Sequence, residues 1–245
     1  MKRMVELSKR MQAVADMVSF GNRVCDVGCD HGYVSIYLVQ SGKSPSALAM
    51  DVNEGPLLRA AEHVHRYGVE NYITLRLSDG LCAYRKGEAD SLLCAGMGGR
   101  LLWKILTKEP DKTEDFKELI LQPQSEIALF RRSLREQGYL FLEEDMVLEE
   151  GKFYPLMKVR KCRPGVDCME EKSEEQYELE DLLGPLLLQR RHPVLKEFIG
   201  RELSLKKDIL DTLQKQQAND RNTDRRRELE REIVLLGRAE SIWRI

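Results

Sequence analysis

The chain has 245 residues, of which 42% are hydrophobic and 33% charged, and its formal net charge is −2. This balance argues against a uniformly basic nucleic-acid-binding protein, so a polyanionic partner would need a local basic patch. The first 18 residues form a charged, amphipathic pattern, and no apolar run approaches the ~20 residues of a membrane span. We therefore expect a soluble, cytoplasmic protein.

Strands and helices are predicted to alternate along the first two thirds of the chain. Apolar residues from Leu7 to Val18 recur at helical spacing and predict a leading helix. The predicted strands that follow are 23–27, 46–51, 72–77, 90–95 and 117–121, and the predicted helices are 33–40, 55–67, 99–106 and 126–137. This alternation is typical of an α/β fold with a Rossmann-like, mostly parallel sheet. Residues 139–160 predict two further strands joined near Gly151, an antiparallel edge hairpin.

The composition changes after Arg160, where a polar stretch contains Pro164 and Gly165. We expect one domain over residues 1–162 and a second, helical domain over residues 170–245. Two long helices that fold back on each other explain the apolar stripes of the second domain. The first stripe comprises Val194, Phe198, Leu205, Ile209 and Leu213, and the second comprises Leu229, Ile233, Leu236 and Trp243.

The cysteines and histidines are scattered. The chain has six cysteines and four histidines, and no two cysteines form a CxxC pair. Zinc sites usually need such clustered ligands, so we expect no metal site.

The first predicted strand runs into the loop "DVGCDHGY", residues 26–33, where α/β proteins bind adenosine-containing cofactors. A dinucleotide fingerprint would place small residues where this chain has Gly28, Asp30 and Tyr33. A carboxylate at the middle position would repel a pyrophosphate, and a tyrosine at the third would block close packing of helix on strand. S-adenosylmethionine carries a positive ammonium and sulfonium instead, and acidic loop residues suit it.

Acidic residues at other strand ends complete the predicted cofactor site. Asp26 and Asp30 are expected to hold the amino-acid end, Asp51 the ribose hydroxyls, and Asp79 the adenine amino group. The remaining predicted cofactor residues are Arg10, Gly28, His31, Gly32, Tyr33, Val52 and Gly80. Arg10 could anchor the cofactor carboxylate or a substrate phosphate, and His31 is assigned a hydrogen-bonding role rather than that of a general base. The alternative is that the aspartates only cap the following helices.

A second glycine-rich stretch follows the fourth predicted strand, at the edge where catalytic groups of open sheets gather. Methyltransferases that act on exocyclic amines commonly carry Asn or Asp followed by Pro-Pro-Tyr there. This chain has Ala95, Gly96, Met97, Gly98 and Gly99 instead, with neither a base nor an aromatic ring. Such a loop suits a flat acceptor whose lone pair needs no deprotonation, such as adenine N1. The alternative is a tight turn that opens the next helix.

The sequence resembles the bacterial tRNA (adenine-22-N1)-methyltransferase family, TrmK, over nearly its whole length. The matching stretches are "LSKRM" (7–11), "DVGCDHGY" (26–33), "GPL" (55–57), "DGL" (79–81), "AGMGG" (95–99), "LILQP" (119–123) and "GPLLL" (184–188). The resemblance implies a class I methyltransferase domain followed by a helical coiled-coil domain. It also implies S-adenosyl-L-methionine as donor and N1 of an adenine in the D-arm region of tRNA, position 22, as acceptor. The chain departs from the family pattern at Cys29, where a small residue is frequent, and at Gln124, where Asn is frequent.

Charge is distributed unevenly between the two predicted domains. Residues 186–245 contain 14 Lys and Arg against 10 Asp and Glu, whereas residues 1–185 contain 25 against 31. The positive segment favours tRNA as partner of a monomeric enzyme, and its candidate phosphate contacts are Arg190, Arg191, Lys206, Lys207, Arg225, Arg226 and Arg227. The alternatives are a nicotinamide-dependent oxidoreductase, a methyltransferase acting on another RNA base or a small molecule, and a non-catalytic RNA-binding protein.

Overall fold

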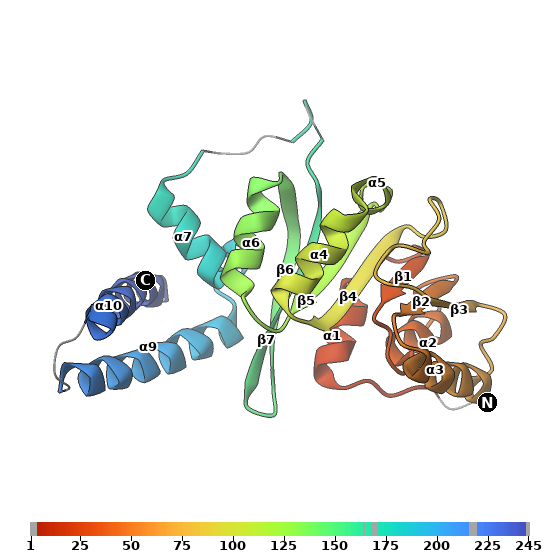
Figure 1. Ribbon diagram of the computed structural model, residues 1–245, viewed down its shortest axis with the longest axis horizontal. Coiled ribbons are helices and arrows are strands. Elements are labelled where there is room, and N and C mark those ends of the chain that lie inside the picture. Colours follow the sequence, from red (N-terminus) through yellow and green to blue (C-terminus); the bar gives the residue numbers. More distant parts are fainter. Residues whose placement is uncertain (1–3, 164, 168–170, 216–219, 244–245) are drawn as a thin grey trace. The chain divides into compact units, whose positions relative to one another are not determined.

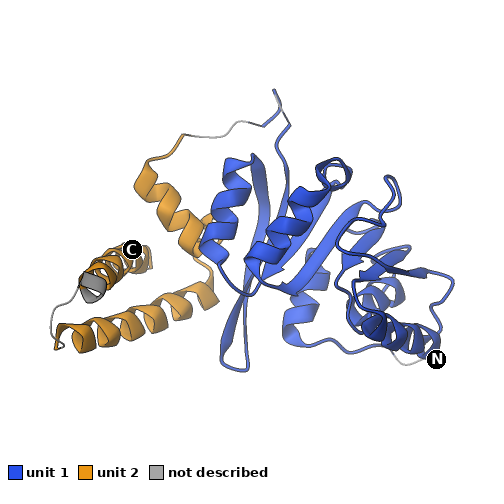
Figure 2. Cartoon of the chain, viewed as in Figure 1, with its two compact units in different colours: residues 1–169 blue, residues 170–245 orange. Residues whose placement is uncertain are grey.

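The computed structural model describes residues 4–163, 165–167, 171–215 and 220–243 of the chain. It divides into two compact units, Met1–Met169 and Glu170–Ile245, which Figure 2 distinguishes by colour. Each unit is described by itself below.

The first unit is built on one seven-stranded sheet with the strand order β3-β2-β1-β4-β5-β7-β6 (Figure 1). The strands are β1 (Val24–Val27), β2 (Ala47–Asp51), β3 (Ile73–Leu77), β4 (Ser91–Met97), β5 (Glu118–Pro123), β6 (Tyr139–Glu149) and β7 (Lys152–Lys161). The helices of this unit are α1 (Lys9–Met17), α2 (Tyr33–Gln40), α3 (Glu54–Tyr67), α4 (Gly99–Lys108), α5 (Pro110–Thr113) and α6 (Ile127–Glu136). Strands β1 to β5 pair in parallel, and β7 runs antiparallel to both of its neighbours. The predicted α/β class, parallel sheet and edge hairpin are therefore confirmed.

The central strands are buried on both faces, which explains why their sequences are apolar runs rather than alternating patterns. The side chains of successive residues in a strand point to opposite faces of the sheet. Cys25, Leu92 and Leu119 pack with residues of α4 and α6. Their neighbours Val24 and Leu93 pack with residues of α1 and α2. This two-sided packing fixes the strand register and so aligns the carboxyl ends of β1, β2 and β4 along one edge.

The second unit is helical. It contains α7 (Glu174–Leu183), α8 (Pro185–Gln189), α9 (Pro193–Gln214) and α10 (Asp220–Ser241). Helices α9 and α10 pack against each other, as the hairpin prediction required. Lys206 of α9 lies 3.3 Å from Glu202 and 2.7 Å from Glu232 of α10, so this lysine joins the two helices.

One detail of the hairpin prediction is wrong. The buried residues of α9 are Leu195, Ile199 and Leu203, spaced four residues apart, whereas Leu205 and Ile209 of the predicted stripe are 50% and 36% exposed. The sequence of α9 carries apolar residues on more than one face, and spacing alone does not tell which face meets a partner helix. In α10, Leu229 and Leu236 are buried as predicted.

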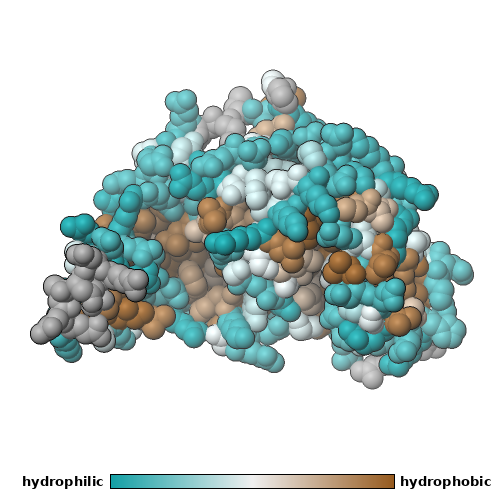
Figure 3. All heavy atoms as spheres, in the orientation of Figure 1, coloured by the Kyte–Doolittle hydropathy of each residue, from teal (hydrophilic) through white to brown (hydrophobic). Residues whose placement is uncertain are grey.

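The surface is largely polar. Figure 3 shows mainly hydrophilic residues on one face of the molecule, interrupted by separate hydrophobic patches. Among the described residues, no helix combines the length and the apolar character needed to cross a membrane.

Candidate functional site

The loop after β1 is shaped by Gly28 and Gly32, which both adopt left-handed backbone conformations with a φ of +73°. A Cβ atom at position 28 would lie 2.1 Å from Cε of Met97. The amides of Gly28 and Cys29 both donate hydrogen bonds to the carbonyl of Met50, at 2.8 and 3.0 Å. The loop therefore lies tightly against the end of β2, and a larger residue at position 28 would disturb both its backbone and its contact with Met97.

Asp26 is a buried carboxylate within β1, with 4% of its surface exposed. Burial raises its pKa to about 6, although a hydrogen bond from Ser35 opposes the shift and nearby Asp51 adds to it. The hydroxyl of Ser35, in α2, donates to Oδ2 of Asp26 at 2.8 Å. Because a buried carboxylate is costly without a charged partner, Asp26 is suited to bind a cation.

Asp51, at the end of β2, is hydrogen-bonded to the loop after β1, to which Asp30 belongs. Oδ2 of Asp51 accepts the backbone N–H of Asp30 at 3.3 Å, and its Oδ1 accepts the N–H of Asn53 at 2.9 Å. The exposed carboxylate of Asp30 lies 3.7 Å from Arg59 and 3.5 Å from His31. Helices α2 and α3 begin after Gly32 and Asn53, without a capping side chain at either position. The alternative that the aspartates serve as helix caps is therefore not supported for these two helices.

Asp79 lies in the loop after β3, in an exposed position. Lys108, the last residue of α4, donates to its Oδ2 at 2.6 Å and lowers the pKa of this carboxyl group. Ser78 organises the rest of the loop, because its hydroxyl donates to the carbonyl of Gly80 at 2.7 Å and accepts the N–H of Ala83 at 3.0 Å.

The motif at 95–99 is bound closely to the loop after β5. The pairing of β4 with β5 shifts register between Ala95 and Met97, and Gly96 has a φ of +79°. The carbonyl of Met97 accepts the N–H of Gln124 at 2.8 Å, and the N–H of Gly99 donates to the carbonyl of Ser125 at 3.1 Å. A Cβ atom on Gly99 would lie only 2.7 Å from that carbonyl oxygen. Glycine at position 99 is thus required for this close approach of two backbones.

Arg10 reaches this region from helix α1. Its Nη1 donates to Oε1 of Gln122 at 3.0 Å, and its guanidinium group lies over the ring of Tyr154, 4.8 Å from the centroid. Its backbone N–H donates to Glu149 at 3.1 Å. Its Nε is buried and has no hydrogen-bond partner among the described residues. The side chain is thus held in place with part of its donor capacity unused.

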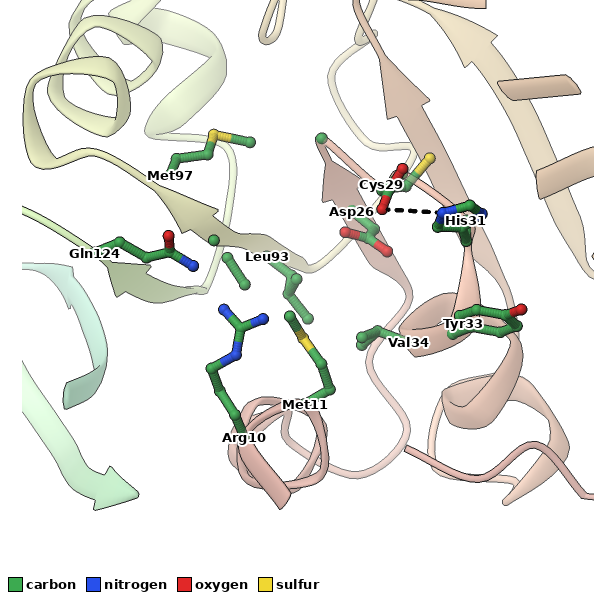
Figure 4. Close-up of a pocket in the computed structure, with 14 residues that line it drawn as sticks. Arg10, Met11, Asp26, Cys29, His31, Tyr33, Val34, Leu93, Met97 and Gln124 are labelled. Carbon is green, nitrogen blue, oxygen red and sulfur yellow. Dashed lines mark ion pairs between the residues drawn. The ribbon is translucent and has the colours of Figure 1, made fainter. Parts of the chain in front are cut away.

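These elements enclose a cavity of about 400 Å³ at the carboxyl edge of the sheet (Figure 4). Its lining includes the predicted residues Arg10, Asp26, Gly28, Asp30, His31, Tyr33, Ala95, Gly96 and Met97. In Figure 4, Arg10 and Met11 point from α1 toward the space between Gln124 and Asp26. The other predicted residues do not line this cavity in the described part of the chain: Gly32, Asp51, Val52, Asp79, Gly80, Gly98 and Gly99.

Sequence reasoning missed several residues at this cavity. Met11, Val34, Leu93 and Gln124 also line it although they were not predicted, whereas Cys29, another lining residue, belongs to the predicted loop after β1. Two signals were available: Met11 follows Arg10 on the same helix, and Gln124 directly follows the "LILQP" stretch. The described residues contain no cluster of three or more His, Cys, Asp or Glu side chains that could hold a metal ion.

Comparisons with known proteins agree with this geometry. Residues 7–157 match the family model of a methyltransferase domain. The chain is 31% identical to the tRNA (adenine(22)-N(1))-methyltransferase of Bacillus subtilis over 95% of its own length and 96% of that protein. The crystal structure of that enzyme, TrmK, superposes with a TM-score of 0.82 at 30% identity, covering 96% of this chain and 99% of the other.

A second similar structure contains a ligand. A proposed tRNA (m1A22) methyltransferase of Streptococcus pneumoniae, in complex with S-adenosyl-L-methionine, superposes with a TM-score of 0.81 at 30% identity, covering 96% of this chain and all of the other. The likeness to these proteins extends over both units of the chain. This chain therefore belongs to the TrmK family of tRNA (adenine-22-N1)-methyltransferases.

Proposed function

We propose that this protein is an S-adenosyl-L-methionine-dependent methyltransferase that methylates N1 of adenine 22, in the D-arm region of tRNA. The observation that carries the proposal is the cavity that brings Asp26, Arg10 and the loop 95–97 together at the carboxyl edge of the sheet. The TrmK relative from Bacillus subtilis, named for the same reaction, supports it.

The residues present fit the cofactor. The buried carboxylate of Asp26 suits the ammonium group, and the unused Nε of Arg10 suits the carboxylate of the same amino-acid end. A volume of about 400 Å³ is within the usual range of about 300–1,000 Å³ for small-molecule sites. Beyond the cavity, Asp51 would hold the ribose, as an acid at the end of the second strand does in dinucleotide-binding folds, and Asp79 would accept a hydrogen bond from the adenine amino group.

The chemistry assigns different tasks to the two sides of the cavity. When bound, S-adenosyl-L-methionine supplies an electrophilic methyl group. The part of the glycine loop that lines the cavity, residues 95–97, allows a flat base to approach its backbone closely at Ala95 and Gly96, which carry little or no side chain. Adenine N1 loses no proton when it is methylated, so this side of the site needs no general base. The chain's contribution is to orient the base, exclude water and hold the cofactor.

We assign the tRNA contact mainly to the helical unit, which carries the net positive charge. Among the described residues, the side chains of Arg190, Arg191 and Lys207 make no ion pair, and all three residues are exposed. Lys206 is different, because it is bound to Glu202 and Glu232 and is only 17% exposed. We therefore expect Arg190, Arg191 and Lys207 to contact phosphates, and Lys206 to hold the hairpin together.

The proposal includes a cytoplasmic, monomeric enzyme with a methyltransferase domain over residues 1–162 and a helical domain over 170–245. Gel filtration with light scattering tests the oligomeric state.

Methyl transfer is tested with purified protein, labelled donor and unmodified tRNA, followed by primer extension to map the modified base. We expect 1-methyladenine at position 22 and no product with a matched tRNA that carries guanine there. Modification at another position, or transfer to free nucleosides but not to tRNA, would refute the assignment.

The tRNA surface is tested by changing Arg190, Arg191 and Lys207 together to alanine. Each lost phosphate contact should reduce the slope of log affinity against log salt by about one. Lys206→Ala is the matched control, and it should lower the thermal stability of the helical unit while leaving the salt slope unchanged. An unchanged slope in the triple variant would remove these residues from the interface.

A further inference from the structure

A buried glutamine lies behind the cavity wall, at the irregular junction of β4 and β5. Where the register shifts between Ala95 and Met97, the N–H of Gly96 donates to Oε1 of Gln122 at 3.1 Å. Gln122 is completely buried and follows the apolar run of residues 119–121 in β5. The regular pairing of β4 with β5 is interrupted at this bulge, and the side chain of Gln122 supplies a hydrogen-bond partner for the amide of the exposed residue Gly96.

The same oxygen accepts a second hydrogen bond, from Nη1 of Arg10 at 3.0 Å. The amide group can have only one orientation here, because an N–H of Gly96 and a guanidinium group are both donors. Its Nε2 donates on the other side to the carbonyl of Pro123 at 3.0 Å. One side-chain oxygen thus joins the glycine loop that faces the acceptor base to the arginine that faces the cofactor.

Arg10 depends on this contact for its position. Its guanidinium group lies on Tyr154 on one side, while Gln122 fixes the nitrogen that points toward the glycine loop. A Cβ atom at Gly96 would lie 3.8 Å from the same Nη1. A displacement of Arg10 would therefore alter the position of Gly96, and a displacement of Gly96 would alter the position of Arg10.

We propose that Gln122 is a positioning residue that couples the cofactor side of the cavity to the base side, through one oxygen shared by Arg10 and Gly96. This inference rests on the proposed function, which assigns one side of the cavity to the cofactor and the other to the acceptor base. It predicts that loss of the oxygen damages cofactor affinity and turnover together, although Gln122 does not line the cavity.

The first test is Gln122→Met, which keeps the length and the unbranched shape but removes both polar atoms. Because two donors lose their shared acceptor and one of them is charged, we expect the dissociation constant of S-adenosyl-L-methionine to rise about tenfold and kcat to fall about tenfold. Calorimetry gives the first quantity and steady-state methylation of tRNA the second. The matched control is Gln12→Met on α1, whose side chain bonds Asp16 and Tyr37 and does not line the cavity. It should change both quantities less than about twofold, because this half-buried side chain has no contact with the cavity.

The second test asks whether Gln122 acts through Arg10. In a cycle with Arg10→Met, the double variant should have the cofactor affinity of Arg10→Met alone, because the arginine that Gln122 positions is already gone. Gln122→Glu retains an acceptor for both donors and, when protonated, a donor for the carbonyl of Pro123, so its cofactor affinity should remain within about threefold of the unchanged protein.

Two results would overturn the inference: multiplicative losses of affinity in the double variant, or values for Gln122→Met equal to those of the unchanged protein. If Gln122→Met does not fold, Gln122→Asn replaces it, because its amide is one methylene too short to reach both donors. The affinity measurements use no tRNA. They remain decisive for the coupling even if the acceptor proves not to be adenine 22.

Discussion

Asp26 and Asp79 both lie toward the carboxyl edge of the sheet, yet their surroundings differ in every respect that affects a charge. Asp26 is buried, accepts a hydrogen bond from Ser35, and has a pKa raised to about 6. Asp79 is exposed, is bonded to Lys108, and has a lowered pKa. The comparison shows that burial and local partners can shift the pKa of the same residue type in opposite directions along one edge of a sheet.

The largest effect is expected at the buried acid. Asp26→Asn should weaken binding of S-adenosyl-L-methionine by about 100-fold or more, because a buried charged partner of the ammonium group is lost. The same change should raise the free energy of unfolding of the free protein by about 1–2 kcal/mol, since burial disfavours the ionised carboxylate but not an amide. Calorimetry and thermal melting measure the two quantities. Asp16→Asn on α1 is the control, and equal cofactor affinity in the two variants would contradict the assignment of Asp26.

The next largest effect is expected in how protein stability and cofactor affinity depend on pH, because both depend on the charge of Asp26. The folded pKa of Asp26, about 6, lies above its usual value, so the free protein takes up a proton and gains stability as the pH falls from about 6 to about 4. Cofactor binding needs the ionised form and should move in the opposite direction, weakening about tenfold for each pH unit below about 6. Calorimetry of cofactor binding across this pH range tests the prediction.

Ser35→Ala should raise the pH at which cofactor affinity begins to fall, because it removes the hydrogen bond that favours the charged form of Asp26. A cofactor affinity that does not change with pH in the unchanged protein would exclude control by Asp26.

A smaller effect is expected at the exposed acid. Asp79→Asn should raise the dissociation constant of the cofactor by about fivefold, because a hydrogen bond to a solvated carboxylate contributes less than one to a buried carboxylate. The loss should be restricted to ligands with an adenine amino group. An inosine analogue of S-adenosylhomocysteine, which lacks that group, should bind both proteins equally, and a loss of equal size for the analogue would refute the assigned contact.

The smallest change is expected for Lys108→Met. Lys108 orients Asp79 in an exposed ion pair, so its removal should weaken cofactor binding by only about twofold, and high salt should abolish the difference. Titrations at low and high salt measure this. A difference that persists at high salt would show that Lys108 contacts the ligand itself.

The sequence was informative wherever one residue type has one dominant structural use. Buried apolar runs located the strands, and the glycines at 28 and 96 located the loops that require left-handed backbone. Sequence patterns predicted less well which side chains are buried or paired, because burial and pairing depend on residues that are distant in the sequence. The burial of Leu195 rather than Leu205, the pairing of Asp79 with Lys108, and the contact between Arg10 and Gln122, 112 residues apart, all required the tertiary structure.

The attachment of helix α1 to the last two strands has a consequence for how the enzyme is made. Lys9 and Arg10 are bonded to residues 148 and 149 of β6, and Arg10 lies against Tyr154 of β7. A growing chain therefore presents the arginine early but cannot hold it until translation has passed residue 154 and this segment has left the ribosome. Nascent chains should accordingly remain unable to capture the methyl donor until nearly all of the first unit has been synthesised.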